Sequence, residues 1–276
     1  MYAQPPAHLP DLPEVRRDMA HFLASARSLD DGVARVLHAL DRTGLAERTL
    51  VILTTDHGLP FPGAKATLFD RGLGVSLVVR GPGGFRGGRV VDAMVSHLDV
   101  LPTLCDLAGL PHPPYLQGRS LLPLVAGETH RLHDELFAEI TFHAAYEPQR
   151  AVRTDRYKLI RRFASLDGPV LPNTDDGPTK DALLELGWEG WATEPERLHD
   201  VLLDPGEGRN LIHDPAYAAV ARDLRERLRR WMAQTGDPLL HGPVPLPPRG
   251  RANSPHGRSA EEPLTELGSE LRPAAA

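Results

Sequence analysis

Apolar positions near the start of the chain follow a helical period. From Val15 to Leu40 they recur every three or four residues, which predicts one long helix. Asp11 and Glu14, with Pro13 between them, match a capping box and place the start of this helix. Gly44 is expected to end it, because glycine readily adopts the left-handed conformation that follows a helix.

The pattern then changes to that of strands. Residues 49–55 and 75–79 are continuous β-branched and leucine runs, typical of parallel strands buried on both faces. Residues 90–96 are expected to form a further short strand, and Asp99 to cap a helix over 100–108. Alternation of helices with buried strands predicts an α/β sheet with helices on its faces.

After about residue 134 the elements become shorter. Three segments predict an antiparallel sheet, two of them joined by a turn at 154–156, and two helical segments follow. The strand segments are 134–140, 150–154 and 157–163, and the helices are 181–186 and one that begins after Asp214 and Pro215. From residue 237 onward, proline and charge dominate and predict disorder. The expected organisation is a half-domain over 1–134, an α+β subdomain over 135–236 and a tail over 237–276.

Composition excludes several classes of protein. The 276 residues are 41% hydrophobic and 25% charged, as in an ordinary globular protein, and one cysteine rules out an intrachain disulfide. The net charge of −6 gives no basic surface for nucleic acid, and no apolar run is long enough for a membrane span. We therefore expect no nucleic-acid or membrane partner. The first fifteen residues do not resemble a signal peptide, any export signal would lie upstream of Met1, and the compartment and oligomeric state stay open.

Candidate chemistry lies where the first buried run ends, in "TTDHG" (54–58). Loops beyond the carboxyl ends of strands bind ligands in α/β sheets, and a carboxylate beside an imidazole suits a divalent cation at Asp56 and His57. An ordinary turn with an exposed histidine explains the same residues equally well. Lys65 follows in a glycine-flanked loop, where it could bind an anion or be a solvated lysine.

A series of motifs in collinear order gives the chain a resemblance to a known family. "TTDHG" is followed by the Lys65 loop, by "SHLDVLPTLCDLAG" (96–109), by "LQGRSLLPLVAG" (116–127), and by "RAVRTDRYKLI" (150–160) and "ERLHDVLLDPGEGRNLIHDP" (196–215). Over residues 10–236 this order resembles the sulfatase family of the alkaline-phosphatase superfamily. The "FP" pair before the lysine loop, "DALLEL" and "TGDP" are most similar to the heparan N-sulfatase (sulfamidase) branch.

The resemblance implies a fold and a set of roles. The fold would be part of an alkaline-phosphatase-like mixed sheet flanked by helices, with a smaller α+β subdomain that holds a short antiparallel sheet and a terminal helix. Asp56 matches a ligand of a divalent cation, usually calcium, with magnesium or manganese as alternatives because His57 stands where many members have asparagine. Lys65 matches the basic residue that contacts the sulfate. His143 matches a histidine of the substrate pocket, although a strand-end histidine without a function is an equal alternative.

One departure from the family is plain. Its nucleophile, a formylglycine made from "C/S-x-P-S-R", has no counterpart in these 276 residues, and Cys105 is expected to be a helical core residue. The N-terminal metal-binding aspartates are missing as well. We therefore expect the C-terminal portion of a sulfatase acting on a sulfated sugar, inactive alone, with formylglycine in the missing part. A phosphatase or phosphodiesterase of the same superfamily and a non-catalytic remnant are the alternatives.

Two further groups of residues are expected to be solvated and without function. His130 and His133 lie three residues apart but lack neighbouring ligands for a zinc site. Asp175 and Asp176 lie in a Pro/Gly-rich stretch that reads as a solvent-exposed loop.

Overall fold

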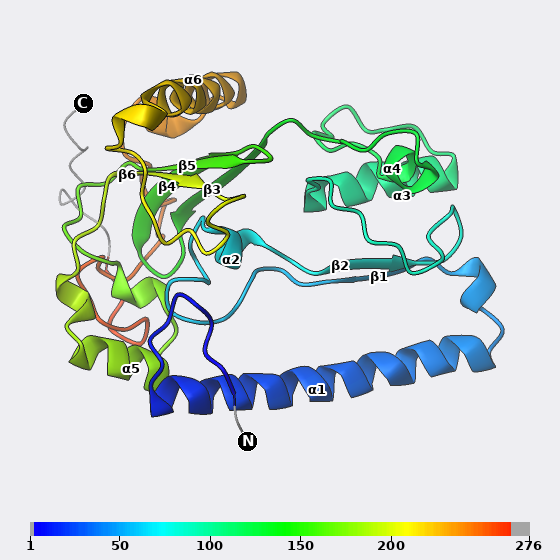
Figure 1. Ribbon diagram of the computed structural model, residues 1–276, viewed down its shortest axis with the longest axis horizontal. Coiled ribbons are helices and arrows are strands. Elements are labelled where there is room, and N and C mark those ends of the chain that lie inside the picture. Colours follow the sequence, from blue (N-terminus) through cyan, green and yellow to red (C-terminus); the bar gives the residue numbers. More distant parts are fainter. Residues whose placement is uncertain (1–2, 266–276) are drawn as a thin grey trace. The chain divides into compact units, whose positions relative to one another are not determined.

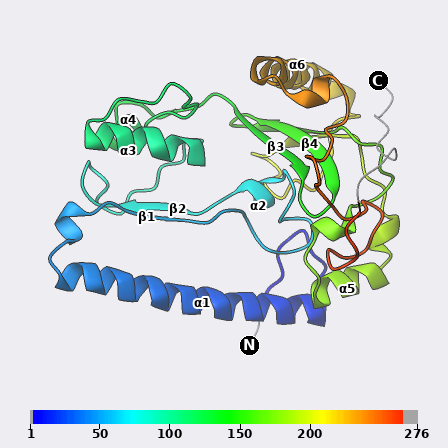
Figure 2. The same cartoon turned by 180° about the vertical axis from the view of Figure 1, so that it is seen from behind.

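The computed structural model describes residues 3–265 and divides into two compact units, each treated below by itself (Figures 1 and 2). Unit 1 comprises Met1–Leu23, His57–Gly74 and Phe137–Ala276, and unit 2 comprises Ala24–Asp56 and Val75–Leu136. The expected division at residue 134 lies close to the last of these boundaries. The N-terminal residues and the segment after His57, however, group with the C-terminal subdomain instead of with the α/β half.

Helix α1 (Pro13–Arg42) is the long helix that the apolar period predicts. It begins at the expected proline, and Gly44 has the left-handed φ of 69° just beyond its end. The expected capping box is not formed, because both Asp11 carboxylate oxygens accept hydrogen bonds from the Arg16 guanidinium. An arginine five residues ahead is a stronger donor to a carboxylate than a backbone amide is.

Unit 1 is built on a four-stranded sheet of order β3-β4-β5-β6. Its strands are β3 (Leu136–Phe142), β4 (Tyr146–Arg153), β5 (Tyr157–Arg162) and β6 (Glu196–Asp200), and β5 runs antiparallel to both β4 and β6. The register pairs Ala151 with Ile160 and Leu159 with Leu198. The predicted turn between β4 and β5 is confirmed, with the Thr154 and Tyr157 backbones hydrogen-bonded at 2.8 Å.

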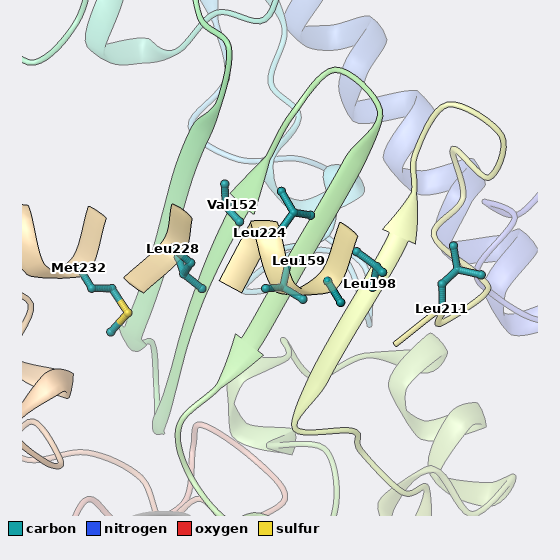
Figure 3. Close-up of a cluster of buried hydrophobic side chains, with 8 residues drawn as sticks. Val152, Leu159, Leu198, Leu211, Leu224, Leu228 and Met232 are labelled. Carbon is teal, nitrogen blue, oxygen red and sulfur yellow. The ribbon is translucent and has the colours of Figure 1, made fainter. Parts of the chain in front are cut away.

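Helix α6 (Ala218–Thr235) covers one face of this sheet, as Figures 1 and 3 show. Asp214 caps the preceding 3₁₀ turn (Pro215–Tyr217), accepting from the Ala216 amide at 3.0 Å, so the predicted cap is confirmed. The shared core consists of eight buried residues from the helix, the strands and the segment after β6: Val152, Leu159, Leu198, Leu211, Ala221, Leu224, Leu228 and Met232. Each large apolar side chain buried in this way contributes about 1.5–3 kcal/mol to folding.

A second cluster in unit 1 joins segments far apart in the sequence. Val15 at the start of α1 packs with Leu9, Phe61 and Leu183, the last on α5 (Pro178–Glu185). The short helix α2 (Asp70–Leu73) follows the Lys65 loop, and the buried Leu68 just before it packs on the sheet beside Ala151 and Ile160. The loop that carries Lys65 is therefore anchored in a packed core on both of its sides.

Unit 2 contains a two-stranded sheet in which β1 (Val51–Thr54) pairs antiparallel with β2 (Leu77–Arg80), Val51 opposite Arg80. The expectation of parallel strands buried on both faces is wrong here, since the strands run antiparallel and are only partly buried. A continuous apolar run indicates a strand but carries no information about its direction or its neighbours. Residues 90–96 do not form the expected strand.

The helical part of unit 2 contains a 3₁₀ turn (His97–Asp99), α3 (Val100–Ala108) and α4 (Leu122–Ala126). Ser96, not Asp99, is the cap, and it forms a capping box in which the Asp99 carboxylate accepts from the Ser96 amide. The buried Asp99 also accepts from the Arg119 amide at 2.7 Å and lies 2.9 Å from His133 Nε2. His133 is thus a partly buried partner of Asp99 and not a solvated residue. Cys105 is buried in α3, as expected.

The part of the predicted tail that the structure describes is packed onto unit 1. Asp237 is 4% exposed and forms an ion pair with the buried Arg150 guanidinium, with Nε 2.5 Å from Oδ2. Asn253 is buried and bridges to Ala145. The expectation of disorder is therefore wrong for residues 237–265, because polar side chains that composition treats as solvated find buried partners. The rest of the predicted tail lies outside the described residues. In the described part of the chain, no helix combines the length and apolarity of a membrane span.

Candidate functional site

The loop after Asp56 is held by its backbone. The Gly58 amide donates to the Gly72 carbonyl at 2.9 Å, and the Leu59 amide donates to the Arg71 carbonyl at 3.1 Å. A side chain at position 58 would place its Cβ 2.0 Å from the Arg71 carbonyl oxygen, so only glycine fits. The glycine of the Asp-His-Gly motif is therefore explained by a close backbone approach that fixes the position of His57.

His57 and Asp56 differ in their surroundings. Asp56 is exposed and is the last residue of its segment in unit 2, whereas His57 is partly buried and is the first of its segment in unit 1. His57 Nδ1 lies 2.9 Å from the Gly58 carbonyl oxygen. Because a carbonyl only accepts, Nδ1 is the donor in this contact.

Lys65 lies in a tight turn between two anchored residues. Its amide donates to the Leu59 carbonyl at 3.1 Å, and the neighbouring Ala64 is completely buried. Its Nζ reaches Asp175 Oδ2 at 2.7 Å, an ion pair in which the lysine side chain is 24% exposed and the aspartate 57% exposed. Asp175 is thus the partner of the candidate anion-binding lysine. The expectation that this residue is merely solvated is wrong.

His143 follows β3 and lies within electrostatic range of the same group. Partial burial lowers the pKa of His143, and the positive charges of Lys65 and His57 lower it further, whereas Asp175 acts in the opposite direction. A neutral ring is favoured beside a cation because two positive charges repel. The structure therefore gathers His57, Lys65 and His143, three of the residues expected from the sequence, and adds Asp175.

A buried ionic network holds this loop from behind. Lys158 on β5 is fully buried, and its Nζ contacts the Asp70 carboxylate, Glu207 Oε1 at 2.9 Å and the Leu68 carbonyl at 3.0 Å. Burial raises the pKa of Glu207 even though Lys158 pulls it down. Burial alone would also raise the pKa of Asp70, but the charges of Lys158 and Arg153 outweigh it and lower that pKa.

The network gives a physical role to the "DPGEGRN" motif. Glu207 Oε2 also accepts from the Asp70 amide at 2.5 Å, so this glutamate clamps α2, which follows the Lys65 loop. Asn210 Oδ1 accepts from the Leu198 amide at 2.9 Å and thereby extends the edge of β6. The sequence singled out this motif but gave it no role. The spacing of Glu207 and Asn210 within the motif was the sequence signal that could have indicated these contacts.

The described residues fit a divalent cation only in part. Asp56 and His57 have suitable donor atoms, but residues 3–265 contain no cluster of three or more histidine, cysteine, aspartate or glutamate side chains placed to hold a metal ion. Calcium takes six to eight oxygen ligands. The pair by itself is therefore an incomplete site, and no chemical step is derived from a metal here.

Two family models match overlapping parts of the chain. A family model described as N-sulphoglucosamine sulphohydrolase, C-terminal, matches residues 61–180, and one described as Sulfatase matches residues 4–110. The chain belongs to the sulfatase family. Human N-sulphoglucosamine sulphohydrolase is 31% identical over 263 residues, covering 86% of this chain and 52% of the human protein. An ulvan-active sulfatase of Formosa agariphila is 32% identical over 246 residues, covering 84% and 41%.

The fold agrees with this membership. A solved structure of a 2-O glycosaminoglycan sulfatase superposes with a TM-score of 0.67 at 27% identity, over 89% of this chain and 50% of that one. The expected mixed α/β architecture of the alkaline-phosphatase-like superfamily is confirmed. This sulfatase chain spans about half the length of the curated relatives that it matches.

Proposed function

We propose that the chain is the C-terminal portion of a sulfatase that hydrolyses a sulfate ester or N-sulfate on a sugar. The main support is that His57, Lys65 and His143 lie in one unit and interact electrostatically. The Lys65 loop also lies within the match to the sulphohydrolase C-terminal model. Two relatives whose names specify sulfated substrates support a sugar sulfate.

In this proposal Lys65 binds the sulfate. Its Nζ is held at the mouth of the site by Asp175, so an incoming sulfate exchanges one anionic partner for another. An exposed ion pair contributes only about 0–1 kcal/mol, so Asp175 presents little barrier to that exchange. When charge builds on the leaving oxygen of a breaking S–O bond, or on the leaving nitrogen of a breaking S–N bond, the ammonium stabilises it.

His143 is proposed to contact the sugar. Its depressed pKa keeps the ring neutral at physiological pH, so it can accept a hydrogen bond at one nitrogen and donate at the other. A neutral donor next to Lys65 suits a sugar hydroxyl or amide better than a second cation would, because the sulfate already has one cation.

Two proposed groups lie outside what these residues provide. Asp56, with His57 beside it, would contribute to a divalent-cation site, calcium being the expected ion, and formylglycine would supply the attacking hydroxyl from a segment beyond this chain. Accordingly the chain alone should not turn over an aryl sulfate or glucosamine N-sulfate, since loss of a nucleophile lowers kcat by about 10⁶. The decisive assay combines this chain with the N-terminal half of a related sulfatase and measures turnover of the same two substrates. Turnover restored by that half supports the proposal, and metal-dependent turnover by the chain alone, lost in Asp56→Ala, contradicts it.

Lys65→Ala tests the assigned lysine in the restored enzyme. We expect kcat to fall by about 10²–10³, as for other donors to developing charge, with the melting temperature little changed because only an exposed ion pair is lost. Arg229→Ala, on the exposed face of α6 with Glu226, is the matched control and should leave kcat unchanged. Turnover of Lys65→Ala close to that of the native sequence would remove the lysine from the mechanism.

Calorimetric titration with calcium tests the metal assignment for the chain by itself. Two ligands from one loop leave most coordination positions to water, so we expect binding no tighter than about millimolar. A submicromolar affinity that disappears in Asp56→Ala would show that the described residues form a complete site after all.

A further inference from the structure

A small cavity lies beside Lys65 within unit 1. Its volume is about 200 Å³, below the roughly 300–1,000 Å³ typical of sites for drug-sized ligands, so it suits a single ring. The Lys65 loop forms one wall, the ends of β4 to β6 form a second, and residues 188–195 form a third. No side chain of this third wall belongs to the proposed site for the cleaved sulfate.

The charges that line the cavity favour an anion. Lys65, Arg162 and Arg197 face it together with two acids, Glu147 and Glu194. Glu147 is engaged by Arg162, whose Nη2 lies 2.8 Å from its Oε1. The Lys65 charge is met by Asp175, which does not line the cavity.

Arg197 is the cation whose charge is least compensated. Within residues 3–265 its guanidinium takes part in no hydrogen bond or ion pair, and its nearest recorded partner is the Phe69 ring, 5.7 Å from Cζ to the ring centroid. It is partly buried on β6. Burial lowers the pKa of Arg197, Glu194 partly offsets this, and the neighbouring Arg162 lowers it again. A partly desolvated guanidinium of this kind would be stabilised by a carboxylate or sulfate.

Arg162, at the end of β5, holds Thr193 of the third wall and the segment 166–168 in place. It donates to the Leu166 carbonyl at 3.2 Å, to the Gly168 carbonyl at 3.1 Å and to Thr193, and its side chain is only 7% exposed. Its buried Nε finds no acceptor among the described residues. Arg162 is therefore fixed by its neighbours and keeps one donor, Nε, that the described residues leave unused.

An aromatic surface completes the cavity. Trp191 lines it and is 50% exposed, and Trp188 lines it while packing on the core around Phe61. An exposed indole beside a guanidinium offers a flat apolar face next to a cation. The C–H face of a pyranose and an anionic substituent at its edge match this pair of surfaces.

We propose that this cavity binds one acidic sugar ring, with its sulfate or carboxylate on Arg197 and its ring against Trp191. The inference deepens the proposed function, on which it rests for the assignment of Lys65 to the sulfate that is cleaved. The ring in the cavity would then be part of the same substrate, so the preferred substrate carries a second anionic group besides that sulfate.

Direct binding to the full 276-residue chain tests this without any need for turnover. The probes are glucuronic acid, glucosamine 6-sulfate, glucose and inorganic sulfate, titrated by calorimetry. We expect millimolar binding of one or both acidic sugars, and binding at least tenfold weaker for glucose and for inorganic sulfate. A preference for glucuronic acid identifies a carboxylate as the ligand group, and a preference for glucosamine 6-sulfate identifies a sulfate.

Arg197→Gln should weaken the acidic sugar about tenfold or more, the usual effect of losing a charge-assisted hydrogen bond. Arg229→Gln, on α6 and outside the cavity, is the matched control and should not change the affinity. Acidic sugars that bind no better than glucose, or an unchanged affinity in Arg197→Gln, would overturn the inference. Either result is independent of whether the restored enzyme cleaves a sulfate, so the two proposals can fail separately.

Tryptophan fluorescence locates the bound sugar. The chain has three tryptophans, of which Trp188 and Trp191 line the cavity, and Trp231 stacks on Phe137 in the α6 core. In a Trp231→Phe background all emission comes from the cavity. A shift on adding the acidic sugar, reduced when Trp191→Phe is added, is the expected result. Calorimetric binding without any change in that emission would place the sugar elsewhere and overturn the assignment.

Discussion

The two units bury their apolar residues to different extents. In unit 1 the sheet and α6 bury eight residues in one cluster, a second cluster packs α1 against α5, and a third packs Leu68 on the sheet. In unit 2 the largest cluster has three buried residues, Leu121, Leu124 and Leu132. There Val78 is 58% exposed, and an apolar hollow of about 820 Å³ lies along β2. A two-stranded sheet is marginal without further covering elements. Apolar strands therefore become a core only where the same chain supplies the elements that cover them.

The largest expected effect concerns the buried ion pair of unit 1, compared with an exposed pair of the same unit. Asp237→Asn leaves the Arg150 guanidinium buried with its main anionic partner removed, which should lower the free energy of unfolding by about 3–5 kcal/mol. Asp223→Asn, whose carboxylate pairs with Arg227 on the exposed face of α6, should lower it by no more than about 0.5 kcal/mol. Urea unfolding followed by tryptophan emission measures both, because all three tryptophans lie in unit 1. Equal effects of the two substitutions would remove the distinction between the buried and the exposed pair.

Truncating one leucine in each unit addresses the comparison directly. Leu224→Ala removes a side chain that is 2% exposed in the main core and should destabilise unit 1 by about 2–5 kcal/mol. Leu104→Ala on α3 removes one that is already partly solvated and should destabilise unit 2 by less than about 1 kcal/mol. Hydrogen exchange resolved by peptide reports each unit separately. A large loss of protection in unit 2 from Leu104→Ala would mean that its apolar surface is better packed than it is described here.

Acid should act on unit 1 through His199. Burial lowers the pKa of His199 to about 4, and its Nδ1 donates to the Arg209 carbonyl, which leaves Nε2 buried without an acceptor for a second proton. The unfolded chain takes up that proton near pH 6.5, so stability falls as the pH drops from about 6.5 to 4, by roughly 3 kcal/mol in total. His199→Gln should flatten this slope in the tryptophan-detected transition. An unchanged slope would assign the acid sensitivity to other groups.

The smallest effect is expected on the exposed strand of unit 2. Val78→Thr keeps the β-branched shape and should change the free energy of unfolding by less than about 0.5 kcal/mol. Because exposed apolar strands promote association, the same change should reduce light scattering on concentration. Increased scattering, or a clear loss of stability, would show that Val78 packs against something in solution.

Local sequence signals predicted the elements of unit 1 well. The Asp214 and Pro215 pair located the start of the terminal helical segment, and the Thr154–Arg156 turn located the β4–β5 hairpin. These signals act over a few residues, so they do not depend on how the rest of the chain folds. The Ser96 cap was missed because Asp99, three residues later, is also a good capping residue, and the two share one capping box.

The signals that failed depended on distant partners. Asp175 was read as solvated because it lies in a Pro/Gly-rich stretch, yet its partner Lys65 lies 110 residues away. The predicted parallel direction of β1 and β2 was wrong for the same reason, since an apolar run does not indicate which strand it pairs with. Of the candidate site, the residue types and their order were predictable. The grouping around His143 required the fold.

The Arg150–Asp237 pair also bears on how the protein is made. The two residues are 87 positions apart, and at about 5–20 residues per second the ribosome adds Asp237 roughly 4–17 s after Arg150. Throughout that interval the β4 guanidinium lacks the carboxylate that compensates its burial, and the last turn of α6 has not been synthesised. Unit 1 therefore closes late in synthesis, and nascent chains that stop short of Asp237 are the ones that chaperones and proteases should recognise.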